Sequence, residues 1–507
     1  MKATSFFLRY DDKKAVAYTD RSRSFSGISR PHRVLDKRTV KSNRKEESDM
    51  KKTKPTGRIL DMTQGKPLKL LLTFALPLFL GNILQQFYNL ADTSIAGHLL
   101  GDAALAQIGA TSALYSLLTN FAFGLNNGLA LTVSRSFGAG DQKEMKRSVC
   151  WMVTLAAISA LVMTVCFLLL RRPLLRVMQT PDDVLEGALS YLTVILAGIP
   201  LTMAYNLESA LLQSMGNSVT PLCFLLFSSF LNVGLDFFFI GNPLNLGVQG
   251  AAAATVLSQG ISAALGGFYI LKNYPEIRFG KEEWKVPRKF VSEMFWTGLS
   301  MALMSAIYNL GSVILQSSIN ALGSVYIAAQ VGGRKLAELF YVPGIALGTS
   351  AATFSSQNYG AGKHSRIAKG AKSGIFMYFC WWLVALAFVI FLAPAAVRFI
   401  TGSSNPEVIA NGALYLRIGI PMIPPMAVLV ILRNILQGMR RPGMPLFCSC
   451  LELIGKTVFA VWLVPAFGYP AVCVCEPVTW VICCAVIAVA VFRIRGEFVD
   501  KIGEQKN

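Results

Sequence analysis

The sequence predicts an all-α integral membrane protein whose twelve transmembrane helices form two homologous six-helix bundles. The first observation is composition: 53% of the 507 residues are hydrophobic and 15% are charged, whereas a soluble domain has roughly 25% charged residues. The second is a series of apolar runs, each close to the ~20 residues that cross a bilayer as a helix. The third is an internal repeat that relates the two halves of the chain.

Apolar stretches follow one another along the chain. They centre near 68–91, 110–133, 148–170, 187–211, 218–240, 249–271, 294–318, 325–354, 372–392, 408–437, 443–465 and 471–492. Lipid offers no partners for backbone polar groups, so only helices and closed barrels span it, and runs of this length indicate helices.

The two halves match at a nearly constant offset of 220–224 residues. The matching segments are Tyr88–Asn89 with Tyr308–Asn309, Phe137–Gly140 with Tyr359–Gly362, Gly198–Pro200 with Gly419–Pro421, and Leu212–Met215 with Leu436–Met439. Because each half holds an even number of spans, both enter the bilayer from the same side and are related by an axis along the membrane normal. We expect two lobes that face each other across a cavity.

Basic residues predict the orientation. Lys and Arg concentrate after the second and eighth expected helices and between residues 272 and 289, which marks these loops as cytoplasmic. Three residues are exceptions to this pattern, because they fall on the outer side: Arg171, Arg172 and Arg176. We expect both termini in the cytoplasm. The expected parts are a basic, disordered cytoplasmic tail over 1–57, an N-lobe over 58–275, a cytoplasmic linker over 276–290, a C-lobe over 291–495 and a cytoplasmic tail over 496–507.

The net charge of +20 does not indicate a nucleic-acid partner. Half of the excess of basic over acidic residues lies in residues 1–66. A basic tail beside a membrane is attracted to anionic lipid headgroups. Residues 1–49 contain no signal-peptide core, and Met50 offers an alternative start. The ten cysteines lack zinc-site spacing, and we find no nucleotide-binding loop. We therefore expect no cofactor, no enzymatic activity, and transport that runs on an ion gradient.

Ionisable and polar residues inside the spans are the informative ones, because a charge at the bilayer centre costs about 2.5–3.5 kcal/mol on insertion scales. Asp92 closes the first span, with Tyr88 and Gln85 one and two turns earlier on the same face. Asn232 and Asp236 share a face of the fifth span, and Thr255 lies early in the sixth.

Two chemistries suit such a cluster. Carboxylates with an amide and a hydroxyl are hard oxygen ligands for a small cation, and a carboxyl group in a poorly solvated pocket can carry a proton. The alternative is structural: Asn232, Asp236 and Thr255 would only form interhelical hydrogen bonds, which are worth about 0.6 kcal/mol on average.

Four segments carry a family resemblance that covers about residues 58–495. They are Pro77–Asp92, Leu231–Asp236, Gly247–Thr255 and Gln357–Gly362. These segments resemble helix 1, helix 5, the start of helix 6 and the loop after helix 8 of the multidrug and toxic compound extrusion (MATE) family, in its prokaryotic, DinF-like branch. The resemblance implies the MATE-like fold.

The same resemblance implies roles for individual residues. Asp92, Asn232, Asp236 and Thr255 would bind the cation or proton, and would be metal ligands if the ion is Na⁺. Gln85 and Tyr88 would line the same cavity, and Pro77 would lie where helix 1 bends; the alternative for Pro77 is a static kink. Where some members have an acid in helix 7, this chain reads Ala306–Asn309, so a C-lobe cation site of that type is not expected.

The C-lobe differs at the equivalent positions. By the repeat offsets, Asp92, Asn232, Asp236 and Thr255 correspond to Ser312, Lys456, Ala460 and Glu476. Lys456 has Glu452 one turn before it, and Glu476 lies early in the last span. We hypothesise that its ammonium group is a tethered cation that locks the C-lobe; the alternative is a structural ion pair with no part in coupling.

The expected function is secondary active antiport. Entry of Na⁺ or H⁺ would drive export of organic, cationic or amphipathic compounds (multidrug efflux) by alternating access. The alternative is a flippase of the same superfamily for lipid-linked oligosaccharides, although such a carrier needs a strongly basic cavity. The expected partners are small-molecule substrates and the lipid bilayer, and the expected state is a monomer in the bacterial cytoplasmic membrane, with several spans.

Overall fold

The computed structural model describes residues 59–241 and 244–498, and within them the secondary structure is helical, with no strand. The α-helices are α3 (Pro67–Leu100), α4 (Asp102–Ala139), α5 (Gln142–Val177), α6 (Asp182–Ala197), α7 (Ile199–Ser214), α8 (Val219–Ile240), α9 (Gly247–Asn273), α10 (Arg288–Ala321), α11 (Ser324–Gly360), α12 (His364–Thr401), α13 (Pro406–Gly419), α14 (Ile423–Gly438), α15 (Gly443–Val458), α16 (Val464–Phe467) and α17 (Tyr469–Arg493). Short segments η1 (Pro275–Ile277), η2 (Ile420–Met422), η3 (Phe459–Leu463) and η4 (Arg495–Phe498) join or end them. The expected tail over 1–57, the alternative start at Met50 and most of the tail over 496–507 lie outside the described residues.

The helices are long and apolar enough to cross a membrane, as the composition predicted. Ten spans of the described chain meet that test alone, and the bent pair α6–α7 gives an eleventh. The twelfth is α11, which packs against α3, α4, α12, α13 and α14. Because other helices surround it, α11 tolerates the small and polar residues that fill much of its length. The protein is therefore a multi-pass membrane protein with six spans in each half.

The fourth span of each half is interrupted at the repeated Gly-Ile-Pro. In the N-terminal half the chain bends by 47° between α6 and α7, at Gly198. In the C-terminal half the short η2 separates α13 from α14 directly after Gly419. Proline has no backbone N–H and its ring clashes with the preceding turn, so it favours a break at the same place in both copies.

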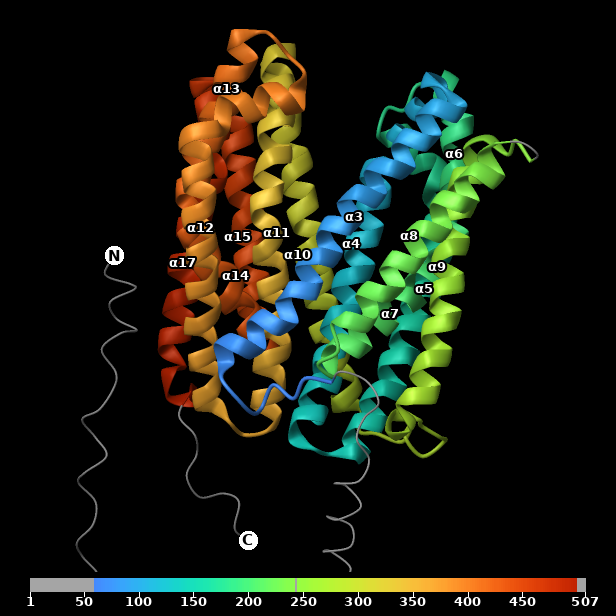
Figure 1. The fold of residues 1–507 in the computed structure, drawn as a ribbon, viewed down its shortest axis with the longest axis vertical. Coiled ribbons are helices and arrows are strands. Elements are labelled where there is room, and N and C mark those ends of the chain that lie inside the picture. Colours follow the sequence, from blue (N-terminus) through green and yellow to red (C-terminus); the bar gives the residue numbers. More distant parts are fainter. Residues whose placement is uncertain (1–58, 242–243, 499–507) are drawn as a thin grey trace, which may run out of the picture. The chain divides into compact units, whose positions relative to one another are not determined.

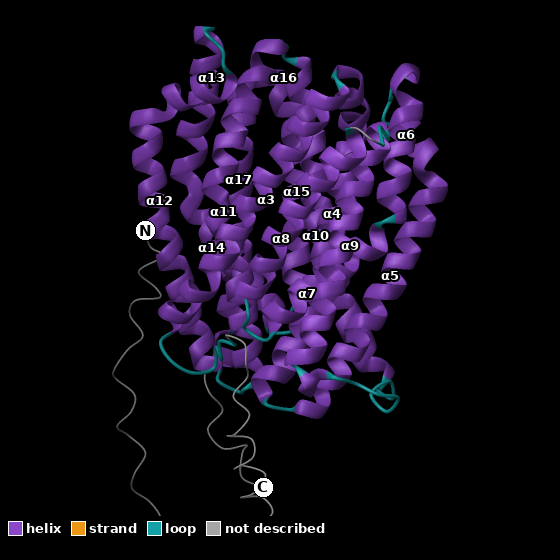
Figure 2. Ribbon diagram, turned by 45° about the vertical axis from the view of Figure 1, so that its right-hand side comes forward, coloured by secondary structure: helices purple, strands orange, loops and turns teal. Residues whose placement is uncertain are grey.

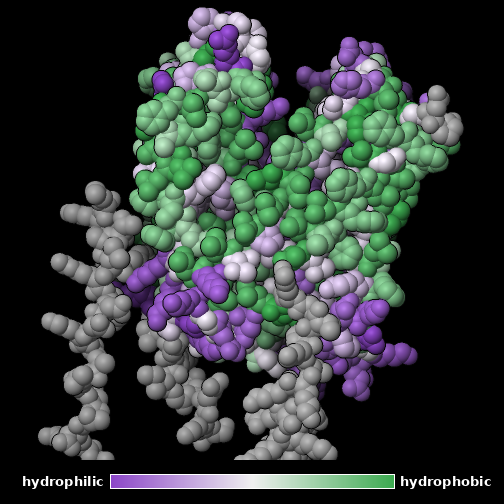
Figure 3. Space-filling view, in the orientation of Figure 1, coloured by the Kyte–Doolittle hydropathy of each residue, from purple (hydrophilic) through white to green (hydrophobic). Residues whose placement is uncertain are grey.

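The described helices form two bundles (Figures 1 and 2). The N-lobe contains α3 to α9, and the C-lobe contains α10 to α17. Each lobe has its own large hydrophobic core. The middle of the surface is apolar, and polar residues gather at the two ends of the helices (Figure 3). Phe391 on α12 is 79% exposed, as expected for a side chain in contact with lipid.

The first helix of each lobe begins in the core of the other lobe. In α3, Ala75, Leu78 and Phe79 pack into the C-lobe core, whereas the later turns pack against α8 and α9. In α10, Met294 and Ala302 pack into the N-lobe core, and its later turns lie against α15. A movement of either helix therefore changes the packing in both lobes. Pro77 lies inside the part of α3 that is rooted in the C-lobe.

The lobes are joined at one end, which we call the closed end, by a crossing of α4 and α11 that follows the internal repeat. Ser134 donates to the Thr353 carbonyl oxygen (3.4 Å) and Ser356 to that of Leu131 (2.7 Å). Each bond is related to the other by the same offset of 222 residues. At the opposite, open end a cleft separates the lobes (Figure 3).

Glycines permit this close approach. A Cβ atom on Gly138 would lie 2.1 Å from the Gln357 carbonyl oxygen, and one on Gly360 would lie 2.0 Å from that of Arg135. These contacts are again related by the repeat offset. In membranes, small residues replace the hydrophobic effect as the means of bringing helices together, because close backbones gain van der Waals contact.

We predict that Gly138→Ala destabilises the protein by about 1–3 kcal/mol, because the new methyl group overpacks the crossing. The measurement is thermal denaturation of the purified protein in detergent. The control is Gly234→Ala in α8, where a Cβ atom meets nothing within 4 Å and where alanine is the better helix former. Equal melting temperatures for the two variants would contradict the role given to the crossing.

Candidate functional site

The predicted polar residues of the N-lobe converge where α3, α8 and α9 meet. Asn232 and Asp236 lie one turn apart on α8 and are both fully buried, and Thr255 on α9 is 5% exposed. With its amide oriented to satisfy both neighbours, Asn232 donates to Asp236 Oδ2 (3.1 Å) and accepts from the Thr255 backbone N–H (3.2 Å). The asparagine thus holds the carboxyl group of α8 against the first turns of α9.

Asp92 brings a second carboxyl group to this place from α3. Its carboxyl group lies close to that of Asp236. One oxygen of each carboxyl group, Oδ1 in both residues, is buried and has no hydrogen-bond partner among the described residues. Two carboxylates in one poorly solvated site repel each other, so they do not both remain ionised unless a cation lies with them. The geometry therefore suits a shared proton or a small cation.

Phenol groups surround the pair. Tyr88, predicted from the sequence, lies against Thr255 and close to both aspartates. Tyr115 on α4 and Tyr191 on α6 are also close to Asp92, and sequence reasoning missed both. Their signal was weak, because a tyrosine in an apolar span is ordinary in a buried helix and neither belongs to a recognisable motif.

One predicted detail of α3 differs from the structure. Asp92 does not close the helix, because α3 continues for two further turns to Leu100 and ends before Gly101, whose φ of 80° suits glycine. The polar residues after Asp92 are compatible with a helix although they end the apolar run. Gln85 donates to Asn89 on its own helix (3.3 Å) rather than to the acidic cluster, and its place as a cavity-lining residue stays a prediction.

The predicted charge cluster of the C-lobe forms two pairs. Lys456 is 1% exposed, lies 3.6 Å from Glu476, and has its ammonium group 4.3 Å from the centre of the Tyr308 ring. Glu476 also accepts from the Tyr415 hydroxyl (3.3 Å). Glu452 pairs instead with Arg433 (3.2 Å).

This cluster is the counterpart of the acidic site in the other lobe. Lys456, Glu476 and Tyr308 stand at the repeat positions of Asn232, Thr255 and Tyr88. A short π-helical segment, η3, begins three residues after Lys456, and such segments occur frequently at functional sites. The C-lobe site therefore carries its own cation, the Lys456 ammonium group. The N-lobe site described above has two carboxyl groups and no basic side chain.

The described part of the chain contains no group of three or more His, Cys, Asp or Glu side chains that could hold a metal ion. The N-lobe site has two carboxyl groups, and its remaining oxygens come from an amide, a hydroxyl and phenols. That donor set suits a hard cation such as Na⁺ rather than a transition metal.

Comparison with known proteins identifies the family. The MatE family model matches residues 77–238 and again 300–462, which is more than half of the chain and one match in each lobe. The chain belongs to the MatE family. It is a membrane transporter and not an enzyme, and the two matches confirm that the lobes are homologous.

Individual relatives and a solved structure support the assignment to the MatE family. The chain is 30% identical over 309 residues to the "Probable multidrug resistance protein YpnP" of Bacillus subtilis, covering 61% of this chain and 68% of that one. It is 23% identical over 390 residues to a "FAD transporter" of Shewanella oneidensis, with 76% and 85% covered. A crystal structure of "MATE in the bent conformation" superposes with a TM-score of 0.81 at 22% identity and covers 87% of this chain and 98% of that one.

We predict that Lys456→Met destabilises the protein by about 3 kcal/mol, because it leaves the Glu476 carboxylate buried without its cation. Adding Glu476→Gln to that variant removes the uncompensated charge and restores most of the lost stability. Thermal denaturation of the two variants and of Glu476→Gln alone gives the coupling energy of the pair. Additive effects of the two substitutions would contradict a direct ion pair.

Proposed function

We propose that this MatE transporter is a secondary antiporter that exports organic, cationic or amphipathic compounds in exchange for Na⁺ or H⁺. The observation that carries the proposal is the Asp92–Asp236 pair, in which Asp236 is buried and Asp92 is half-buried. Each of these carboxyl groups has an oxygen without a hydrogen-bond partner in the described structure. Such a pair changes its free energy strongly when a cation or proton enters, which is the property that a coupling site requires.

The position of the pair on two helices, α3 and α8, connects occupancy to conformation. Asp92 lies on the half of α3 that packs in the N-lobe, whereas the first half of α3 is rooted in the C-lobe. A bound cation or proton removes the repulsion between Asp92 and Asp236, so α3 can approach α8. An empty, ionised pair pushes α3 away. Pro77, which removes one backbone hydrogen bond from α3, provides the place where the helix would bend.

The orientation follows from the charges of the loops. The first turns of α5 and α12 and the segment between α9 and α10 carry many Lys and Arg residues, and the starts of α5 and α12 lie at the closed end. The positive-inside rule predicts a cytoplasmic closed end. The cleft then opens to the outside, where Na⁺ or H⁺ enters down its gradient and substrate is released.

The C-lobe would contribute a fixed charge. Because Lys456 supplies a permanent cation beside Glu476, that lobe has no need of an entering ion. We propose that ion exchange is confined to the N-lobe, and that the C-lobe moves as a rigid partner. Normal ion coupling in Lys456→Met would instead make this lysine a purely structural residue.

The names of the relatives and the chemistry of the site support the substrate class. YpnP is named as a probable multidrug resistance protein. An acidic N-lobe site favours a cationic compound that competes with the entering ion, whereas a lipid-linked pyrophosphate would need a strongly basic cavity. One relative is named as a FAD transporter, and FAD is an anion, so a substrate screen should include anionic compounds.

We predict that wild-type protein drives efflux of a fluorescent cationic dye from energised cells or inverted vesicles, and that Asp92→Asn loses this efflux. The amide keeps the shape of the side chain but removes the charge that the cation or proton compensates. Imposing Na⁺ and pH gradients separately identifies the coupling ion.

The matched control is Asp102→Asn, an exposed aspartate at the first turn of α4, which should leave efflux unchanged. If the wild type moves dye under neither gradient, export of organic cations is contradicted and flipping of lipid precursors becomes the next assay. If Asp92→Asn keeps gradient-driven efflux, the acidic pair is not the coupling site.

A further inference from the structure

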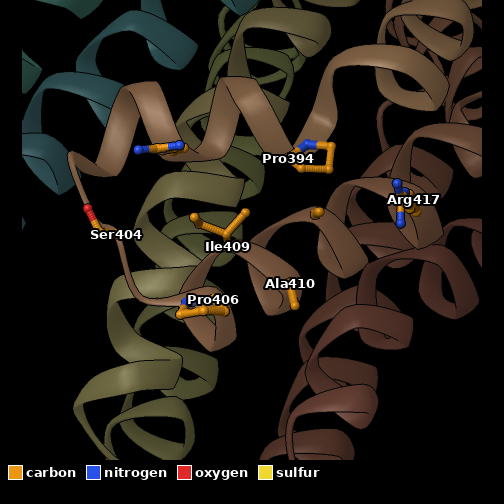
Figure 4. Close-up of a pocket in the computed structure, with 8 residues that line it drawn as sticks. Pro394, Ser404, Pro406, Ile409, Ala410 and Arg417 are labelled. Atoms are coloured by element: carbon orange, nitrogen blue, oxygen red, sulfur yellow. The ribbon is translucent and has the colours of Figure 1, made fainter.

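The C-lobe carries a second polar feature that lies outside the transport site. A pocket of about 470 Å³ is formed at the open end of this lobe by the last turns of α12, the following turn and one face of α13. Its lining includes Pro394, Arg398, Ser404, Ile409, Ala413 and Arg417 (Figure 4). Two arginines thus border one small pocket.

The two arginines reach the pocket from different heights because α12 and α13 are antiparallel neighbours. A helical side chain leans toward the N-terminus of its own helix. Arg398, three residues before the end of α12, therefore leans away from the open end, and Arg417 on α13 leans toward it. Pro406, Ala410, Ala413 and Arg417 recur at three- and four-residue spacing, so they form one face of α13.

Neither arginine side chain has an anionic partner among the described residues. Both are exposed, and no ion pair joins either side chain to another residue of the described chain. Glu407, the nearest acid in the sequence, lies about 100° around α13 from Pro406 and away from the pocket face. The pocket is therefore positively charged.

Arg417 stands inside a candidate membrane span, where an unpaired charge is costly. Arg417 lies eleven residues after the start of α13, which is roughly 16 Å along the helix axis. An arginine at such a depth is stabilised by reaching the interface and by contact with an anion. Large apolar side chains flank the site, with Phe391 79% and Phe399 85% exposed. The pocket thus combines cationic groups with a surface that suits acyl chains.

We propose that this pocket binds the phosphate headgroup of an anionic phospholipid from the outer leaflet. Arg398 and Arg417 grip the phosphodiester through charge-assisted hydrogen bonds, Ser404 donates to it, and the acyl chains lie along Phe391 and the exposed face of α12. The lipid then fills the gap between α12 and α13 at the open end. This inference depends on the proposed orientation of the chain in the membrane and not on the transported ion.

The test is lipid binding by the purified full-length protein in detergent, followed by native mass spectrometry. The probes are phosphatidylglycerol and phosphatidylcholine with the same acyl chains. We expect phosphatidylglycerol to bind more tightly, and Arg417→Gln or Arg398→Gln to weaken that binding roughly tenfold. Arg417→Lys, which keeps the charge, should retain part of the affinity.

The matched control is Arg176→Gln, which removes an exposed arginine from the last turn of α5, at the open end of the N-lobe. It should leave phosphatidylglycerol binding unchanged. Wild-type affinity in the Arg398→Gln, Arg417→Gln double variant would overturn the site, and so would an equal loss in Arg176→Gln. Equal affinity for phosphatidylcholine would overturn the anionic class, and displacement by millimolar inorganic phosphate would show a free-anion site instead of a lipid site.

Discussion

Two carboxyl groups, those of Asp92 and Asp236, occupy one buried place in the N-lobe, and the surrounding structure depends on how their charge is compensated. Asn232 and Thr255 hold the carboxyl group of α8 in place through the asparagine amide. Asp92 comes from α3, which is the helix whose other half belongs to the C-lobe. A protein with a purely structural polar cluster would have no reason to bury two acids together, because each costs about 2.5–3.5 kcal/mol at the bilayer centre.

The two copies of the internal repeat share their packing contacts at the closed end but differ in their polar sites. The crossing of α4 and α11 uses paired serines and glycines related by the repeat, so the closed end is held by the same contact made twice. The polar sites have instead diverged. The C-lobe carries Lys456 where the N-lobe carries Asn232, which turns one of two ancestral sites into a self-compensated pair. In the proposed mechanism, the N-lobe responds to an ion while the C-lobe stays unchanged.

The sequence predicted the fold and most of the candidate site for clear physical reasons. Hydropathy determines which segments cross a bilayer, and intramembrane acids such as Asp92 and Asp236 stand out because they are rare. Spatial partners without a motif were not predictable: Tyr115 and Tyr191 are distant in sequence, and Arg433 rather than Lys456 pairs with Glu452. The exchange of α3 and α10 between the lobes was also missed, since periodicity does not reveal which lobe a half-helix joins. The assignment of ion-binding roles stays a prediction.

The most direct test measures a distance across the open end by double electron–electron resonance spectroscopy. Labels at Met178 in the N-lobe and Phe399 in the C-lobe, in a background without the exposed cysteines Cys166, Cys223, Cys380 and Cys450, report on the cleft. Titration with Na⁺ or with acid should shift the distance distribution in otherwise wild-type protein and leave it unchanged in Asp92→Asn. An equal shift in both proteins would contradict the claim that the Asp92–Asp236 pair couples an ion to the movement of the lobes.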